Sequence, residues 1–487
     1  MRSGEGVQTN PKESGKPSGR MAEYLYIVLF LLLCLVTFAG LASGKHSGAD
    51  ERADMTGFPS VTAADGGVNL EYLQQAGNWF QEHFAFRQEL VTANAKLYSA
   101  LFHESASDQV IQGTDGWLYY RDSLADYQGT DLMTDRALYD IAHTAAMTQN
   151  YCSLFGIDYL FALAPNKATI YPEHMPYYLR PHASGQSNRT RLASFMEQEQ
   201  VAWLDLSERL KEAKENGEAR ALPELYHRTD SHWTAEGAAI AAKEILSRLH
   251  ISGKDYGSAE YVVRKDFSGD LERMLYPAAA RPEEEVYYDP SPSYGYVDEV
   301  ESTFDYYIHT VSGGAGGSLV MYRDSFGNAI LPFLAEAFES AFFTRGIPYT
   351  LTDLYECDAS AAVFLRAERF LPELAERPPV LEAMPLTDLT EETAREELSQ
   401  INAEMTSALE DANPYYSRIE GVLEKAPKSG ERIFAAPGDG SLYEAMPLHR
   451  KDGKEGFVLY LPAEKTEKLP DAASWEIYLG SKTVVCY

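Results

Sequence analysis

Residues 318–338 read SLVMYRDSFGNAILPFLAEAF and contain the repeating unit of the fold. The apolar run 318–322 has the composition of a buried strand, while 328–338 carries apolar residues at the three- and four-residue steps of a helix face. Between them lies a polar turn that contains Arg323, Asp324 and Ser325. The stretch therefore predicts a strand that ends in a polar turn and leads directly into a helix.

The same alternation of strand and helix recurs along the chain. Helices are expected at 134–154 and 235–249, and strands at 159–163, 201–204, 341–344 and 361–365. Strands that alternate with helices indicate an α/β domain in which helices flank a largely parallel sheet. Ligands of such sheets bind at the carboxyl ends of the strands, so the turn after 318–322 is a candidate site.

Near the N-terminus, residues 24–42 form an uncharged apolar run, YLYIVLFLLLCLVTFAGLA. A helix of this length crosses about 30 Å of hydrocarbon. Basic residues precede the run, which favours a cytoplasmic segment 1–23, a single-pass anchor in the cell membrane and a body on the extracellular or periplasmic side. A cleaved signal peptide is the alternative, with small residues near 42–44 as its cleavage site. Residues 43–69, rich in Gly, Ser, Ala and Asp, are expected to form a tether.

The rest of the chain is expected to form two parts. Residues 70–385 hold the alternating strands and helices, preceded by a long helical pattern over 70–101, and would form the main domain. After residue 385 the pattern changes to a charged helix over 390–409, followed by short strands between turns. This indicates a small β-rich accessory region over 386–487, in which no catalytic combination of residues stands out.

Composition argues against several classes of function. The chain has 73 Asp and Glu against 42 Lys and Arg, a formal charge of −31. Nucleic-acid affinity depends on basic side chains that neutralise phosphates, so a nucleic-acid partner is not expected. The four cysteines have neither the spacing of a zinc site nor the density of a disulfide framework. We expect no metal and no cofactor.

Two polar stretches carry the residue types of nucleophilic catalysis. Residues 229–234 read TDSHWT, with Thr234 suited to cap the helix that follows. Asp230 could accept the Nδ1–H of His232 there and leave Nε2 free as a base. Ser325 lies where a strand meets a helix, so its backbone N–H and the helix dipole would face an oxyanion. Each stretch alone is more commonly explained by a helix cap or by polar residues in contact with solvent. A Ser-His-Asp site would form only if the two stretches lie together at one edge of the sheet.

Five stretches together resemble the AlgX/AlgJ-like family of SGNH-hydrolase-like proteins, which includes the DHHW proteins. In the family's order they are VIQGTDGWLYY (110–120), LAPNKATIYPEHMP (163–176), TDSHWT (229–234), DFSGDLERML (266–275) and RDSF (323–326). The resemblance implies an SGNH-hydrolase-like sheet of permuted topology and O-acetyl transfer onto a secreted or cell-wall polysaccharide. It makes Ser325 the nucleophile, His232 the general base and Asp230 its orienting carboxylate. It also implies a membrane-bound O-acyltransferase (MBOAT-type) protein as the partner that delivers the acyl group.

This chain departs from the family pattern in two places. Arg323 and Asp324 precede the serine where the wider superfamily has Gly-Asp, and DSHW replaces the commoner DHHW. Asn166, which follows the expected strand 159–163, is a second candidate for the oxyanion hole, although shaping a turn is the simpler interpretation. Lys167, Tyr171 and Arg323 could contact the acyl donor or the sugar, while solvation at the surface is the simpler interpretation of each.

The sequence leaves two other functions open. One is an esterase or deacetylase with the same triad, in which water replaces the sugar hydroxyl. The other is a non-catalytic, membrane-tethered subunit that binds glycan. The negative charge favours a neutral or cationic acceptor in either case, since an anionic glycan would be repelled.

Overall fold

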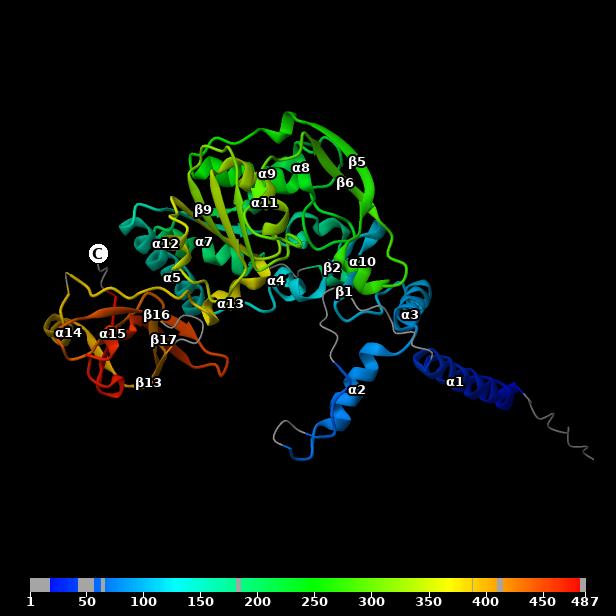
Figure 1. The fold of residues 1–487 in the computed structure, drawn as a ribbon, viewed down its shortest axis with the longest axis horizontal. Coiled ribbons are helices and arrows are strands. Elements are labelled where there is room, and N and C mark those ends of the chain that lie inside the picture. Colours follow the sequence, from blue (N-terminus) through cyan, green and yellow to red (C-terminus); the bar gives the residue numbers. More distant parts are fainter. Residues whose placement is uncertain are drawn as a thin grey trace, which may run out of the picture. The chain divides into compact units, whose positions relative to one another are not determined.

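The computed structural model (Figure 1) describes residues 18–42, 57–62, 66–180, 185–387, 389–409 and 415–481. The chain divides into two compact units, one within Met1–Phe102 together with Leu275–Ala279, the other comprising His103–Met274 and Ala280–Tyr487. Most of the expected cytoplasmic segment 1–23 and of the expected tether 43–69 lies outside the described residues.

The first unit contains helices α1 (Ser18–Ala42), α2 (Tyr72–His83) and α3 (Arg87–Phe102). In α1 the window Glu23–Gly40 is long and apolar enough to cross a membrane, as either an anchor or a signal sequence. The long helical pattern over 70–101 is two helices, because Phe84 is extended and Phe86 has a φ of 64°. A left-handed residue cannot continue an α-helix, and the apolar spacing on either side carries no sign of this break.

The second unit is built on a seven-stranded sheet of order β4-β3-β11-β9-β10-β8-β7. Its strands are β3 (Asp158–Ala164), β4 (Trp203–Asp205), β7 (Gly295–Tyr296), β8 (Tyr307–Val311), β9 (Ser318–Arg323), β10 (Ser340–Thr344) and β11 (Ala361–Ala367). The first five strands in the order are parallel, and β8 and β7 complete the sheet in antiparallel fashion. The predicted α/β class with a largely parallel sheet is confirmed.

Helices cover both faces of this sheet because its strands are apolar on both sides. On one face α9 (Ala235–Arg248) and α11 (Gly327–Ala337) pack against alternate residues such as Leu319 and Met321 of β9. On the other face α5 (Asp135–Leu154) packs against the residues between them, among them Val320 and Tyr322. The remaining helices of the second unit are α4 (Leu124–Gln128), α6 (Lys167–Ile170), α7 (Asn188–Gln198), α8 (Leu206–Glu215), α10 (Asp270–Leu275), α12 (Asp353–Glu356), α13 (Leu371–Glu376), α14 (Glu391–Glu397) and α15 (Ala463–Thr466).

Two hairpins and a second sheet complete the second unit. The hairpins are β1 (Val110–Gln112) with β2 (Leu118–Tyr120), and β5 (Glu260–Phe267) with β6 (Glu283–Asp289). The second, antiparallel sheet consists of β12 (Ser399–Ile401), β13 (Ala403–Leu409), β14 (Tyr416–Leu423), β15 (Arg432–Ala436), β16 (Tyr443–His449), β17 (Glu455–Pro462) and β18 (Glu476–Gly480). It forms the β-rich C-terminal part that the sequence predicts, and its form is barrel-like, which was not predicted.

The predicted charged helix over 390–409 is wrong in its extent. Only Glu391–Glu397 is helical, with Thr390 as its N-cap, and strands β12 and β13 follow directly. Charged and small residues favour a helix locally, but β13 pairs with β14 along its whole length, from Ala403 opposite Leu423 to Leu409 opposite Ser417. Cross-strand pairing has overridden local propensity here.

Candidate functional site

Ser325 lies in the turn between β9 and α11, at the carboxyl edge of the parallel sheet. Asp324 fixes this turn, because its two carboxylate oxygens accept hydrogen bonds from the backbone N–H groups of Phe326 (2.9 Å) and Ala367 (2.7 Å). The second of these bonds joins the turn to the end of the neighbouring strand β11. The serine side chain is therefore held at one place on the edge of the sheet.

The loop before α9 brings the histidine to the same edge. Thr234 caps α9, since its hydroxyl accepts the N–H of Gly237 at 3.3 Å. The neighbouring Trp233 donates its indole N–H to the carbonyl of Phe326 (3.1 Å), and the His232 ring packs edge-on against the Phe326 ring. These contacts join two loops that lie 93 residues apart in the chain.

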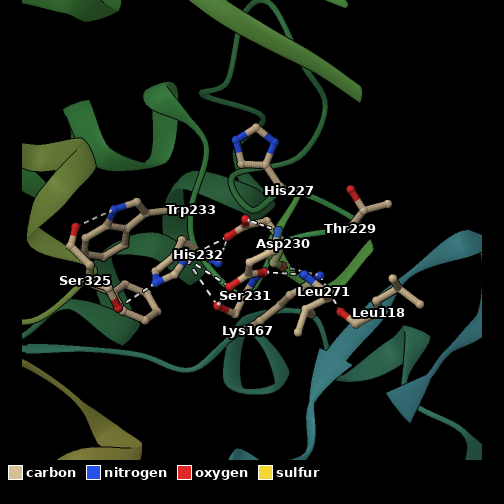
Figure 2. A network of polar contacts seen from close by, with 12 residues as sticks. Leu118, Lys167, His227, Thr229, Asp230, Ser231, His232, Trp233, Leu271 and Ser325 are labelled. Carbon is tan, nitrogen blue, oxygen red and sulfur yellow. Dashed lines mark hydrogen bonds and ion pairs between the residues drawn. The ribbon is translucent and has the colours of Figure 1, made fainter. Parts of the chain in front are cut away.

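Figure 2 shows Asp230, His232 and Ser325 in a single row of hydrogen bonds. The Nε2 atom of His232 lies 2.8 Å from Ser325 Oγ, and its Nδ1 atom lies 2.7 Å from Asp230 Oδ1. A carboxylate opposite Nδ1 places the ring proton there and leaves Nε2 as acceptor for the serine hydroxyl. The His232 side chain is 21% exposed and Ser325 is half-buried, so reactants can reach both. Chemically, this arrangement can activate a serine hydroxyl.

Asp230 is held as a carboxylate although it is buried. Burial alone would raise its pKa, but the charge and hydrogen bond of His232, together with other donors, hold the pKa well below its usual range. Its Oδ1 atom also accepts the backbone N–H of His232 (2.9 Å), and its Oδ2 atom accepts the N–H of Asp270 (2.7 Å). The group that orients His232 is thus ionised throughout the neutral pH range.

Asp270 is a second carboxylate beside the Asp230–His232 pair, and no role was expected for it from the sequence. Its oxygens accept hydrogen bonds from the backbone N–H and the hydroxyl of Ser231. Burial and the nearby charge of Asp230 raise the pKa of Asp270. Its position in DFSGDL, within a stretch that carries the family resemblance, is the only sequence signal of this proximity.

Asn166 follows β3 and is buried beside charged groups. Its Nδ2 atom lies 3.4 Å from Asp126 Oδ2, and its Oδ1 atom accepts a hydrogen bond from Arg369 (3.3 Å). Its backbone N–H donates to Glu368 (3.1 Å). These contacts place Asn166 at the carboxyl end of β3, and its role in an oxyanion hole stays a prediction.

The interpretation of Lys167 as a solvated surface residue is wrong. Lys167 is 4% exposed, and its ammonium group donates to the backbone carbonyls of Leu118 (2.6 Å), Arg228 (2.8 Å) and Asp230 (2.9 Å). Burial lowers its pKa to about 7. A lysine enters the interior when acceptors surround its ammonium group, and three distant carbonyls do so here. Lys167 therefore ties the loop that carries Asp230 to the hairpin β1–β2.

Tyr171 and Arg323 are also interior residues, and their interpretation as surface residues is wrong. The Tyr171 hydroxyl accepts the N–H of Leu225 (2.8 Å), and Trp117 packs against its ring. The Arg323 guanidinium, 0% exposed, donates to the carbonyls of Thr303 (3.0 Å) and Asp305 (3.2 Å) and to the side chain of Asn328. Burial lowers the pKa of Arg323 to about 10. Both side chains have backbone groups far away in sequence among their hydrogen-bond partners.

Gly327 is explained by the same arginine. A Cβ atom at this position would lie 2.7 Å from the Cβ and Cδ atoms of Arg323, closer than carbon atoms pack. In the stretch RDSFG, the glycine at position 327 therefore leaves room for the side chain of the buried Arg323.

Asp230, His232 and Asp270 each present a ligand atom within 4.8 Å of one another, a spacing that a metal could use. Their oxygens already have other partners, because both oxygens of Asp230 and both of Asp270 accept protein N–H or O–H groups. The atoms that a metal would use are thus already engaged in hydrogen bonds within the protein.

An α/β sheet with a serine, a histidine and an aspartate joined at its carboxyl edge has the architecture expected of an SGNH-hydrolase-like protein. Residues 110–302 match the family model described as the SGNH hydrolase-like domain of the acetyltransferase AlgX. Over this segment the chain is similar to the AlgX/AlgJ family of SGNH-hydrolase-like proteins. Asp230 and His232 lie inside the matched segment, and Ser325 lies beyond its end.

The chain is similar to curated relatives and to solved structures. The probable alginate O-acetylase AlgJ of Pseudomonas fluorescens is 30% identical over 237 residues, which cover 47% of this chain and 53% of the relative. The chain thus spans about half the length of this curated relative. Among solved structures, the O-acetyltransferase domain of Pseudomonas putida AlgJ is 19% identical with a TM-score of 0.35, covering 54% of this chain and 92% of that one. A DHHW family protein from Eubacterium siraeum is 18% identical with a TM-score of 0.38, covering 54% and 91%.

Proposed function

We propose that this protein is an extracytoplasmic O-acetyltransferase that acylates hydroxyl groups of a secreted or cell-wall polysaccharide through an acyl-serine intermediate. The observation that carries the proposal is the hydrogen-bonded row from Asp230 through His232 to Ser325. The match of residues 110–302 to the family model supports acetyl transfer as the reaction, since that model describes an acetyltransferase. The AlgJ relatives are named as probable alginate O-acetylases, which supports a polysaccharide as the acceptor.

In the first half-reaction, His232 removes the proton of Ser325 as Oγ attacks the carbonyl carbon of the acyl donor. The backbone N–H of Ser325 stabilises the tetrahedral oxyanion, and the Asn166 side chain is the second proposed donor. Collapse of this intermediate expels the leaving group, which takes the proton from His232, and leaves acetyl-Ser325. In the second half-reaction a sugar hydroxyl gives its proton to His232 and attacks the acetyl group. Ser325 then regains the proton, and the sugar ester is released.

The setting of the reaction is proposed from the N-terminal helix and the charge. Residues 24–42 anchor the chain in the cell membrane with its body outside, where a membrane-bound O-acyltransferase (MBOAT-type) protein supplies acetyl groups. The helix Ser18–Ala42 and its basic flank support this orientation. Sequencing the N-terminus of the membrane-bound protein tests it, because a signal sequence would be missing from the mature chain. The charge of −31 favours a neutral or cationic acceptor.

An esterase is the second candidate, because water can reach the partly exposed Ser325 and His232 and replace the sugar hydroxyl. The same acyl-enzyme serves both reactions, so the acceptor decides between them. A glycan-binding subunit without catalysis would bind oligosaccharide with or without the Ser325 hydroxyl.

The test uses the full chain in detergent with p-nitrophenyl acetate as donor, with and without neutral oligosaccharide. We expect acetylated sugar from the wild type, and a fall in rate on the order of 10³-fold or more in Ser325→Ala. Ser474→Ala, which removes an exposed hydroxyl on the C-terminal part, is the matched control. Acetylated sugar from Ser325→Ala at the wild-type rate would contradict the proposal, and release of acetate without sugar product would favour the esterase.

A further inference from the structure

Ser231, the residue between the histidine and its carboxylate, is itself clamped. Its backbone N–H donates to Asp270 Oδ1 (2.8 Å), and its hydroxyl donates to Asp270 Oδ2 (2.7 Å). The same hydroxyl oxygen lies 3.2 Å from His232 Nδ1. A hydroxyl that donates to Asp270 presents its lone pairs in other directions, so it can act as a secondary acceptor for the Nδ1 proton.

Asp270 acts on the pair from the opposite side. Its backbone N–H donates to Asp230 Oδ2 (2.7 Å), which is the carboxylate oxygen that His232 does not use. The Asp270 side chain also accepts the N–H of Leu271 (2.7 Å), which fixes its own rotamer at the start of α10. Asp270 Oδ2 lies 3.7 Å from His232 Nδ1. Both ends of the Asp230 carboxylate are thus held, one by the histidine and one by Asp270.

This arrangement places two mostly buried carboxylates next to each other, which is electrostatically unfavourable. Simple capping of α10 does not require it, because an exposed side chain can cap a helix. Such unfavourable pairs occur preferentially at functional sites, where the reaction requires the groups in fixed positions even though their repulsion lowers stability. Ser231 is also the position at which this chain reads DSHW in place of DHHW.

We propose that Ser231 and Asp270 are positioning residues that hold the Asp230–His232 pair in line with Ser325. The proposal rests on the proposed function, because it assigns their role to the same acyl transfer. Two hydrogen bonds to Asp270 fix the backbone at Ser231, and this backbone determines the orientation of the side chains of Asp230 and His232. The loss of these hydrogen bonds is expected to lower the rate of the chemical step, because neither residue is proposed to contact the donor or the sugar.

The experiment compares the wild type with Ser231→Ala, Asp270→Asn and the double variant, all as full chains in detergent. The first readout is the rate at which phenylmethylsulfonyl fluoride labels Ser325, followed by intact mass and peptide mapping. The second is kcat and KM for p-nitrophenyl acetate. The matched control is the pair Ser441–Asp439, an exposed turn in which serine hydroxyl and N–H groups also contact one aspartate.

We expect each single variant to lose about tenfold in labelling rate and in kcat, with KM changed less than about twofold. The double variant should be no slower than the slower single variant, because the two residues act as one clamp. Ser441→Ala and Asp439→Asn should match the wild type. Thermal unfolding checks that each variant folds, and Ser231→Ala, which removes a single oxygen atom, decides the question if Asp270→Asn does not fold.

Labelling of Ser231→Ala at the wild-type rate, or losses that simply multiply in the double variant, would overturn the positioning role. Failure of the proposed function has a different signature, because the wild type itself would then not be labelled at Ser325.

Discussion

Replacing Asp230 by Asn keeps the shape of the side chain but removes its negative charge and one of its two acceptor oxygens. The hydrogen bonds that Asp230 accepts determine the effects expected on stability and on kcat. The carboxylate accepts three N–H groups, two from His232 at Oδ1 and one from Asp270 at Oδ2. An amide has one acceptor oxygen. If that oxygen faces His232, the amide NH₂ faces the N–H of Asp270; if it faces Asp270, the NH₂ faces the backbone N–H of His232.

Either orientation leaves a buried donor without an acceptor, which costs about 1–3 kcal/mol of unfolding free energy. The second orientation also stabilises the tautomer of His232 whose proton lies on Nε2, where it blocks uptake of the serine proton. We therefore expect a moderate loss of stability and a loss of kcat on the order of 10³–10⁴-fold, the size found when such a triad loses its carboxylate.

The assay measures kcat for p-nitrophenyl acetate and urea unfolding for the wild type and Asp230→Asn. Asp255→Asn is the matched control, because Asp255 also accepts a backbone N–H, that of Gly257, but lies on the surface. Asp230→Asn with more than about a tenth of the wild-type kcat, in a preparation where Ser325→Ala is inactive, would refute the orienting role of Asp230.

Two further predictions concern stability. Asp324→Asn should lower the unfolding free energy by about 1–3 kcal/mol, because one amide oxygen cannot accept both Phe326 N–H and Ala367 N–H; an unchanged urea midpoint would contradict the role of Asp324 in fixing the turn. In the folded chain the pKa of Lys167 is lowered to about 7, so between about pH 7 and pH 10 the unfolded chain binds more protons than the folded chain. The free energy of unfolding therefore rises by about 1.4 kcal/mol per pH unit in this window. Lys167→Met should remove this gain, and urea unfolding of both proteins at pH 7.5 and pH 9 measures it; equal slopes would show that Lys167 does not titrate in this window.

The sequence by itself determined the features that depend on neighbours along the chain. The apolar run 318–322 and the periodic stretch 328–338 predicted β9, α11 and the polar turn that holds Ser325. Thr234 predicted the start of α9, because a hydroxyl just before a helix can accept a hydrogen bond from a backbone N–H group of the first turn. Both local patterns depend only on contacts within a few residues, so they can be read without the fold.

Tertiary structure alone decided which of these pieces meet. The contact between His232 and Ser325 spans 93 residues, and it follows from the strand order that puts β9 beside β11 with the α9 loop over their ends. Likewise, no local pattern marks Lys167 and Arg323 as interior residues, because the carbonyls that accept their protons come from other loops. A charged side chain is buried only where distant acceptors replace water, and those acceptors exist only once the chain has folded. The clamp of Ser231 by Asp270, and the β13 strand in place of a helix, have the same origin.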